Sequence, residues 1–159
     1  MSDTKPLSAG TSDVVAHMGV WFSNLGVPRA AGQLFGYLLV CDPAEQSASE
    51  IAAGIGMSRA SVSSSARLLA SMNAIEERHR VGDRKTYYRL RSAWWIEVTT
   101  AKLNGFTELA DMARRSRAAG GMTRTDGLDE LIEFSEFWAQ EIPRLVERWN
   151  RRHDTKEDE

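Results

Sequence analysis

The sequence has almost no cysteine, since Cys41 is the single one among 159 residues. One thiol cannot form a disulfide within its own chain, and it cannot by itself build a zinc site. Long apolar runs are also missing: the longest, Leu34 to Cys41, is far shorter than the roughly 20 residues that a membrane-spanning helix needs. The first ten residues lack the apolar stretch of a secretory signal. We therefore expect a cytoplasmic protein without membrane contacts.

Signatures of catalysis and of metal binding are equally scarce. The run Ser63-Ser64-Ser65 lacks the flanking glycines of a nucleophile elbow, and no glycine-rich phosphate loop occurs. The histidines, His17, His79 and His153, stand at no spacing that metal ligands use. We expect no enzymatic activity, no metal and no cofactor, so the sequence points to a binding function.

The charge is unevenly distributed. The chain carries a net charge of −2, yet residues 59–91 contain eight basic and three acidic side chains, a net of +5, which leaves −7 for the remainder. Most of these basic residues are arginines, and clusters of this kind make the phosphate contacts of nucleic-acid-binding proteins. Charge alone fits a polyanion-binding surface and a solvated charged face about equally well.

The N-terminal part predicts two helices after a flexible arm over residues 1–10. Thr11, Ser12 and Asp13 offer N-cap side chains to a helix whose apolar residues recur every three or four positions and which ends at Gly26. Pro28 suits the start of a second helix, apolar nearly all round and therefore buried, which stops before Pro43. Residues 11–45 should form N-terminal helices that serve the core and a dimer contact.

Residues 46–91 carry the most informative pattern. Ser47 and Glu50 fit a capping box at the start of a short helix through Ile55. A turn at Gly56-Met57 leads to a second helix, capped by Ser58, whose Val62, Ala66, Leu69 and Met72 form an apolar stripe. The opposite side holds serines and arginines, and short hydroxyl side chains let a helix approach another surface closely. Two strand-forming runs, 75–80 and 85–90, then flank a turn with Gly82-Asp83, a hairpin signal with a basic tip.

The C-terminal part predicts two longer helices. Ser92 could cap the first, which has two apolar faces, and Gly120-Gly121 ends it. The second carries a broad apolar stripe from Leu128 to Trp149 and should kink at Pro143. Two apolar faces exceed what one small core can cover, so we expect residues 92–153 to form dimerisation helices. The charged residues 154–159 should form a disordered tail.

Helix, tight turn, serine-capped helix and basic hairpin follow in the order of a winged helix-turn-helix. We expect a mostly α fold with a small β-hairpin wing, flanked by N- and C-terminal dimerisation helices. The recognition helix would enter the major groove of double-stranded DNA, and the wing would contact the adjacent backbone or minor groove. The predicted DNA-binding residues are Ser58, Arg59, Ser61, Ser63, Ser64, Arg67, Arg78, Arg80, Arg84 and Lys85.

The segment from Ser47 to Arg91 resembles the MarR family of bacterial transcriptional regulators. Residues 58–63 look like the start of that family's recognition helix, and Gly82-Asp83-Arg84-Lys85 like the Asp-Arg-Arg element of its wing. Residues 36–43 and 82–91 look closer to an actinobacterial branch that includes mycobacterial repressors of membrane efflux transporters. The likeness covers residues 13–95 well and continues only as a helical layout. Lys85 replaces the usual arginine, and Asn73 stands where glycine commonly ends the recognition helix.

The resemblance implies a homodimer whose winged domains occupy successive major grooves of a palindromic operator. It further implies a sequence-specific regulator, and we expect a ligand-responsive repressor of a transport or efflux operon. A pocket lined by Trp21, Phe22, Trp94 and Trp95 could hold a small apolar effector, although packing of these rings in the core explains them as well.

Two other functions stay open at this point. The winged fold could serve as a protein-interaction module without ligand-responsive DNA binding, in which case DNA binding would be weak and insensitive to salt. Alternatively, Cys41 could make the protein a redox-responsive regulator. No cation adjoins Cys41 in the sequence to lower its pKa, which favours a buried structural thiol.

Overall fold

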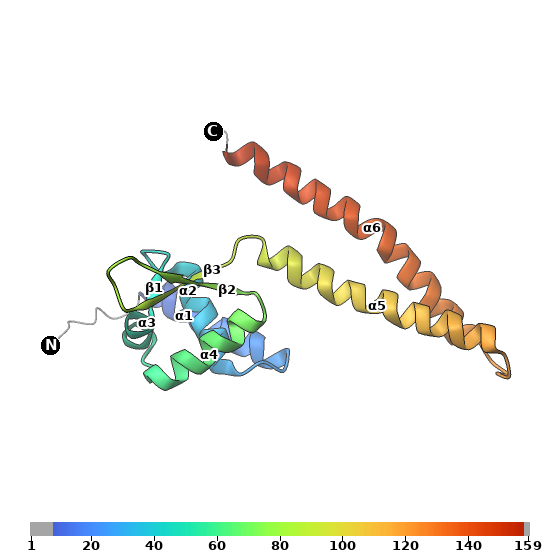
Figure 1. Cartoon of the computed structure of the whole chain (residues 1–159), viewed down its shortest axis with the longest axis horizontal. Coiled ribbons are helices and arrows are strands. Elements are labelled where there is room, and N and C mark those ends of the chain that lie inside the picture. Colours follow the sequence, from blue (N-terminus) through green and yellow to red (C-terminus); the bar gives the residue numbers. More distant parts are fainter. Residues whose placement is uncertain (1–7, 158–159) are drawn as a thin grey trace. The chain divides into compact units, whose positions relative to one another are not determined.

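The computed structural model describes the backbone of residues 8–157, and the side chains of these residues except 102–104 and 153–157. The chain divides into two compact units, Met1–Trp94 and Trp95–Glu159. The first contains α1 (Ala9–Asn24), α2 (Arg29–Val40), β1 (Gln46–Ser47), α3 (Ala48–Ile55), α4 (Arg59–Ser71), β2 (Ile75–His79) and β3 (Thr86–Leu90). The second is built from α5 (Trp94–Ala119), whose first residue belongs to unit 1, and α6 (Asp126–Glu157) (Figure 1).

The core of unit 1 forms where α1 crosses α2 at very short range. A Cβ atom at Gly32 would lie 2.5 Å from the carbonyl oxygen of Met18, so only glycine permits this approach. The rings of Phe22 and Phe35 pack with centroids 5.1 Å apart, and Trp94 lies against both. The Trp94 indole N–H donates to the carbonyl oxygen of Met72 at 3.1 Å. Trp94 thereby joins the end of α4 to the α1–α2 pair.

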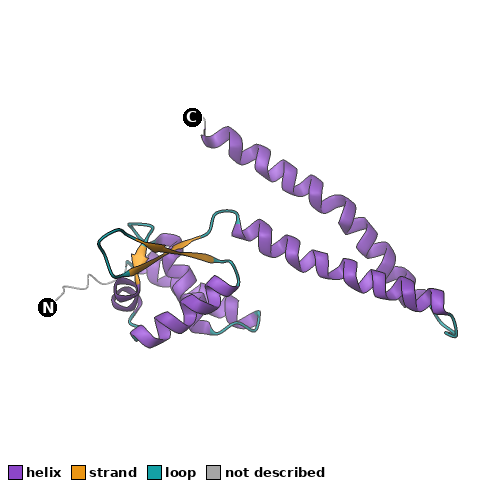
Figure 2. Ribbon diagram, in the orientation of Figure 1, coloured by secondary structure: helices purple, strands orange, loops and turns teal. Residues whose placement is uncertain are grey.

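A three-stranded antiparallel sheet in the order β1-β3-β2 completes unit 1 (Figure 2). Ile75 pairs with Leu90 and His79 with Thr86, so β2 and β3 form the predicted hairpin. In β1, Ser47 pairs with Tyr87 of β3, the central strand of the sheet, so the cap of α3 lies beside the hairpin. Two residues are too few to produce an alternating pattern, so the sequence did not reveal this strand.

Unit 2 is a helical hairpin whose first helix ends at Gly120-Gly121, as the sequence predicted, and both glycines adopt positive φ. Ala110 and Ala113 of α5 are fully buried against Ile132 of α6. Arg114 donates to Glu136 at 2.7 Å, and Arg117 pairs with Asp129. Figure 1 shows α5 and α6 close together near this turn and diverging towards their other ends. α6 continues as a helix through Pro143.

The structure corrects several predicted element boundaries. α1 starts at Ala9 and is capped by Ser8, which accepts from the Thr11 N–H at 3.2 Å, so residues 9 and 10 are not part of an arm. Ser92 does not begin α5, because Ala93 adopts a positive φ of 61° between it and the helix. α6 runs to Glu157, beyond the predicted end at residue 153, since neither Gly nor Pro interrupts residues 144–157.

Two further corrections concern α2. Pro28 is the N-cap and Arg29 the first helical residue, one position later than predicted. The helix is not buried all round either: Ala31, Leu34, Phe35 and Leu38 are buried, whereas Leu39 and Val40 at its end are exposed. An apolar composition shows which residues could be buried, and only the packing of α1 and α4 on one side decides which are.

Candidate nucleic-acid interface

The helix-turn-helix is fixed by two caps and one glycine. Ser47 Oγ accepts from the Glu50 N–H, and Glu50 Oε2 accepts from the Ser47 N–H at 2.7 Å, which completes the predicted capping box. The Ser47 hydroxyl also donates to Glu50 Oε2 at 2.6 Å, and this bond together with that from the Ser47 N–H lowers the pKa of Glu50 below its ordinary value. Gly56 ends α3 in the left-handed conformation, and Ser58 caps α4 by accepting from the Ser61 N–H at 3.1 Å. The sequence predicted all three features.

α4 has one buried side and one exposed polar side. Val62, Ala66 and Leu69 are completely buried against the rest of unit 1. The opposite side exposes the predicted DNA-binding residues of this helix, with Ser61 partly covered; these are Arg59, Ser63, Ser64 and Arg67, together with the cap Ser58. Ser64 Oγ donates to the carbonyl oxygen of Ser61 at 3.0 Å, and Arg67 Nε to that of Ser63 at 3.4 Å. Main-chain acceptors thus hold these side chains close to the helix surface.

The wing is shaped by the turn between β2 and β3. Gly82 has a φ of 82°, and the Asp83 N–H donates to the carbonyl oxygen of Arg80 at 3.1 Å. Asp83 Oδ1 accepts from the Lys85 N–H at 2.9 Å, and Oδ2 accepts from the Tyr87 hydroxyl at 2.8 Å. These bonds lower the pKa of Asp83 and raise the pKa of Tyr87. The turn is therefore a defined structure rather than a loose loop.

Arg59 and Lys85, from α4 and the wing, line the same small concavity. Its volume is about 200 Å³. Ser49 at the start of α3 and Thr86 of β3 also line it. The concavity combines two cations with hydroxyl groups, a composition suited to a phosphate oxygen. Arg84 at the tip is exposed, like Lys85.

Arg78 and Arg80 differ from the other predicted contacts because both have acidic partners within unit 1. Arg78 Nη2 lies 2.8 Å from Glu76, which Arg89 also contacts. Burial raises the pKa of Glu76, but the hydrogen bonds and charges of Arg78 and Arg89 together outweigh it and leave the pKa lowered. Arg80 Nη2 lies 3.3 Å from Glu45. The guanidinium of Arg80 also covers the Tyr87 ring, 3.9 Å from its centroid. Charge counting in the sequence could not distinguish these two arginines from Arg84.

The four aromatic residues predicted to line an effector pocket fall into different environments. Phe22 and Trp94 are buried in the core of unit 1, and Trp21 is exposed on α1 beside Phe22. Trp95 belongs to unit 2, where it lines an apolar groove of about 240 Å³ between the diverging parts of α5 and α6. The groove is lined by Trp95, Ile96, Thr99, Thr100, Ile142, Leu145, Val146 and Trp149.

The environment of Cys41 gives no support to a reactive thiol. The side chain is half-buried at the end of α2, 3.8 Å from the carbonyl oxygen of Leu38. Burial raises the pKa of the Cys41 thiol, and the nearby Asp42 raises it further. A raised pKa reduces the thiolate fraction, which is the form that oxidants attack.

Two further observations on the described residues concern metal binding and membrane-spanning helices. Among the side chains that the structure describes, no three His, Cys, Asp or Glu residues come close enough to hold a metal ion. None of the helices within the described range is long and apolar enough to cross a membrane.

Four residues around the interface had not been predicted as functional: Glu45, Ser49, Thr86 and Tyr87. Ser49 and Thr86 join the concavity through tertiary contact, which leaves no local pattern in the sequence. Tyr87 stands four residues after Asp83. This short spacing in a hairpin is the signal from which contact between the Tyr87 hydroxyl and the Asp83 carboxylate could have been predicted.

Comparison with known proteins identifies relatives of both units. Residues 93–152 match the model of a family described as MmpR5-like MarR family transcriptional regulators. The HTH-type transcriptional regulator MmpR5 of Mycobacterium tuberculosis is 38% identical over 101 residues, which cover 64% of this chain and 61% of that relative. A crystal structure described as a transcriptional regulator superimposes with a TM-score of 0.72 at 30% identity, covering 89% of this chain and 99% of that one.

The family match extends the sequence analysis in one respect. Residues after 95 had been related to the MarR family only by their helical layout, whereas the family model matches 93–152 directly. The structural match covers most of the chain and agrees with a mostly helical fold bearing a small antiparallel sheet. Both relatives are described as transcriptional regulators. The comparisons therefore relate this chain to the MarR family of winged helix-turn-helix transcriptional regulators.

Proposed function

We propose that the protein is a homodimeric regulator that binds a palindromic operator and represses a transport or efflux operon until a small apolar effector releases it. The observation that carries the proposal is the joint exposure of the serine and arginine side of α4 and the basic tip of the wing in one unit. Regulators of this family bind DNA and typically act as dimers. The chain spans about three fifths of the mycobacterial relative's length, 61%, in the aligned region.

The two basic elements have different tasks in this proposal. Arg84 and Lys85 at the wing contact phosphates, because long cations at an edge reach the backbone and carry little sequence information. Ser64 and Arg67 on α4 face the base edges, where arginine can pair with guanine O6 and N7. Arg78 also remains available for a phosphate, since an exposed ion pair such as Arg78–Glu76 contributes little to stability.

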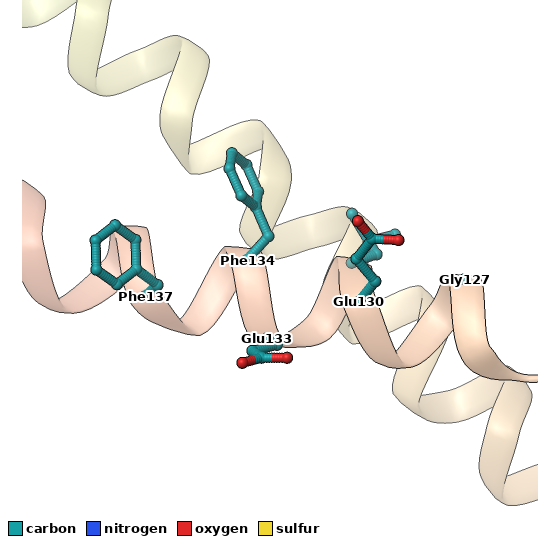
Figure 3. A pocket seen from close by; sticks show the side chains of 6 residues that line it. Gly127, Glu130, Glu133, Phe134 and Phe137 are labelled. Atoms are coloured by element: carbon teal, nitrogen blue, oxygen red, sulfur yellow. The ribbon is translucent and has the colours of Figure 1, made fainter.

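Unit 2 supports the proposed dimer. Its exposed large apolar side chains outside the groove beside Trp95 include Leu109 and Met112 on α5 and Phe134 and Phe137 on α6. Figure 3 shows Phe134 and Phe137 projecting from one side of α6, with Glu133 on the opposite side. Phe137 is 57% exposed, an unfavourable state for a phenyl ring unless another surface covers it. A second copy of the hairpin would supply that surface and bring two recognition helices into one complex.

The groove beside Trp95 is the place in the described structure that suits the proposed effector. Its lining is almost wholly apolar, and Trp95 and Trp149 belong to different helices. A ligand between α5 and α6 would favour one separation of these helices over another. The ligand releases the operator only if the protein binds DNA more weakly at the favoured separation. Coupling of this kind is typically worth about 1–3 kcal/mol, or about 5- to 150-fold in affinity.

Salt-dependent binding of duplexes selected from a random pool tests the DNA-binding proposal. Replacing Arg84 or Lys85 by Ala should weaken all duplexes similarly and reduce the salt slope by about 0.9 for each lost phosphate contact. Replacing Arg67 should instead change the preferred base pairs. Arg124→Ala is the matched control, because it removes an exposed arginine from the turn of unit 2. Weak binding without salt dependence would contradict the proposal and favour a protein-interaction module.

Effector binding needs its own titration. Fatty acyl, aromatic and quaternary ammonium compounds would be added while tryptophan fluorescence and operator affinity are followed together. We expect a ligand that changes the fluorescence to lower operator affinity, and Trp149→Ala to abolish both effects. If every compound that binds leaves the operator affinity unchanged, the effector part of the proposal fails and DNA binding is unaffected.

A further inference from the structure

The wing turn of unit 1 is held by four side chains that form a connected set, here called the wing network: Glu45, Arg80, Asp83 and Tyr87. Glu45 precedes β1, Arg80 follows β2, Asp83 lies in the turn, and Tyr87 is in β3. Arg80 joins Glu45 to the Tyr87 ring, and the Tyr87 hydroxyl joins that ring to Asp83. The network therefore links the base of the wing with its tip.

Tyr87 is the central member because its two ends serve different contacts. The side chain is buried, with 7% of the residue exposed, and its strand lies between β1 and β2. The ring face accepts the Arg80 cation, an attraction that strengthens as it is shielded from water. The hydroxyl donates to the Asp83 carboxylate, whose other oxygen accepts from the Lys85 N–H. The position of Lys85 is therefore coupled to a buried ring.

Arg80 is placed differently from Arg84 and Lys85, although all three carry positive charge. Its guanidinium already contacts a carboxylate and an aromatic face. Turning this guanidinium away towards a phosphate would uncover the Tyr87 ring and weaken the charge compensation of Glu45. Arg84, by contrast, has no ion pair among the side chains that the structure describes.

We infer that Arg80, Tyr87 and Asp83 are positioning residues: they hold the wing turn so that Arg84 and Lys85 can contact the backbone of DNA, and Arg80 itself contacts no phosphate. This inference rests on the proposed DNA-binding function. It assigns a role to Tyr87, which bears no charge and would be missed by any search for cations. It also separates Arg80 from the arginines that contribute counterion release.

Tyr87→Phe is the sharpest test, because it removes one hydroxyl and leaves charge, ring and strand unchanged. We expect operator affinity to fall about 3- to 10-fold, the effect of losing one hydrogen bond, with an unchanged salt slope. Arg80→Gln should also lower affinity without changing the slope. Tyr37→Phe is the matched control, since it removes a tyrosine hydroxyl from α2 outside the wing.

Amide hydrogen exchange provides a readout that needs no DNA. In Tyr87→Phe the Lys85 N–H should exchange about 2- to 10-fold faster, whereas amides of α4 should keep their rates. If Arg80→Gln reduces the salt slope by about 0.9, Arg80 contacts a phosphate and the inference is wrong. An unchanged Lys85 exchange rate in Tyr87→Phe would also overturn it. If the wild-type protein binds no duplex, the proposed function fails, and the exchange measurement still decides whether the network orders the wing.

Discussion

The two units of the chain bury their apolar residues to very different extents. Unit 1 encloses Phe22, Phe35, Leu34, Ile51 and Leu69 almost completely. Among the side chains that the structure describes in unit 2, the buried apolar ones are few and include the small Ala110 and Ala113 together with Ile132 and Ile142, whereas large ones such as Phe137 and Trp149 are exposed. Because exposed apolar surface is costly, the difference supports the proposal that unit 1 is stabilised by its own core and unit 2 by a partner.

The sharpest way to test this comparison is to remove one large ring from the core of unit 1. Phe35→Ala should lower the free energy of unfolding by about 3–5 kcal/mol, because a buried phenyl group is lost and a cavity remains. Val81→Ala, at a fully exposed position of the wing, should stay within about 0.5 kcal/mol of the wild type. Urea unfolding at one fixed protein concentration measures both, and equal effects would mean that the ring does not support the core.

The same kind of change in unit 2 should affect assembly and not the fold of the single chain. Phe137→Glu places a charge where the partner is expected, so the dimer dissociation constant should rise by at least about 100-fold. Light scattering over a range of concentrations would detect the shift to monomers. Met122→Glu, at an exposed residue in the turn region between α5 and α6, is the control and should remain dimeric. A Phe137→Glu protein that stays dimeric would show that α6 does not form the interface.

Close helix packing within unit 1 gives a smaller effect. Gly32→Ala should destabilise unit 1 by about 1–3 kcal/mol, because its Cβ would meet the Met18 carbonyl oxygen and the Phe22 Cβ. Gly10→Ala adds the same methyl group to α1 where nothing lies within 4 Å. It should leave stability unchanged or raise it slightly, since alanine favours helices. Thermal unfolding followed by circular dichroism compares the two variants, and equal melting temperatures would contradict the close α1–α2 contact.

The smallest predicted effect is a pH dependence at the cap of α3. The folded-state pKa of Glu50 lies below its ordinary value of 4.5 because Ser47 donates to the carboxylate. The resulting stabilisation is complete above the unfolded pKa and is lost as the pH falls through the folded one. The stability difference between the wild type and Glu50→Gln should therefore shrink as the pH falls below about 4.5. A difference that is constant from pH 7 to pH 3 would show that the charge does not matter.

Local sequence patterns predicted most of the winged unit. Caps, glycine turns and the hairpin depend on residues close together in the chain, and Ser47, Gly56, Ser58 and Asn73 all have the expected roles. The short strand β1 and the wing network depend on contacts between distant segments, so no local sequence pattern predicted them. The partners of Arg80 illustrate the limit: Glu45 is 35 positions away in the sequence.

In unit 2 the sequence predicted the two apolar faces of α5 but not which face the chain covers by itself. Ala110 and Ala113 are buried by α6, whereas Leu109 and Met112 on the other face remain exposed. Small residues permit the closer helix contact, and the bulkier face is the one left exposed, where we propose that a partner packs. The extent of α6 was underestimated because its charged end looked like a tail, although it contains no helix-breaking residue.

The central claim is that unit 1 reads DNA while unit 2 joins two copies. Operator duplexes with one or two half-sites, titrated with wild type and Phe137→Glu, test it most directly. The wild type should bind the two-site duplex as a dimer and far more tightly than the one-site duplex, because the second contact occurs at high effective concentration. Phe137→Glu should lose this advantage while keeping the wild-type affinity for a single half-site. Equal affinity of both proteins for the two-site duplex would contradict the division of tasks between the units.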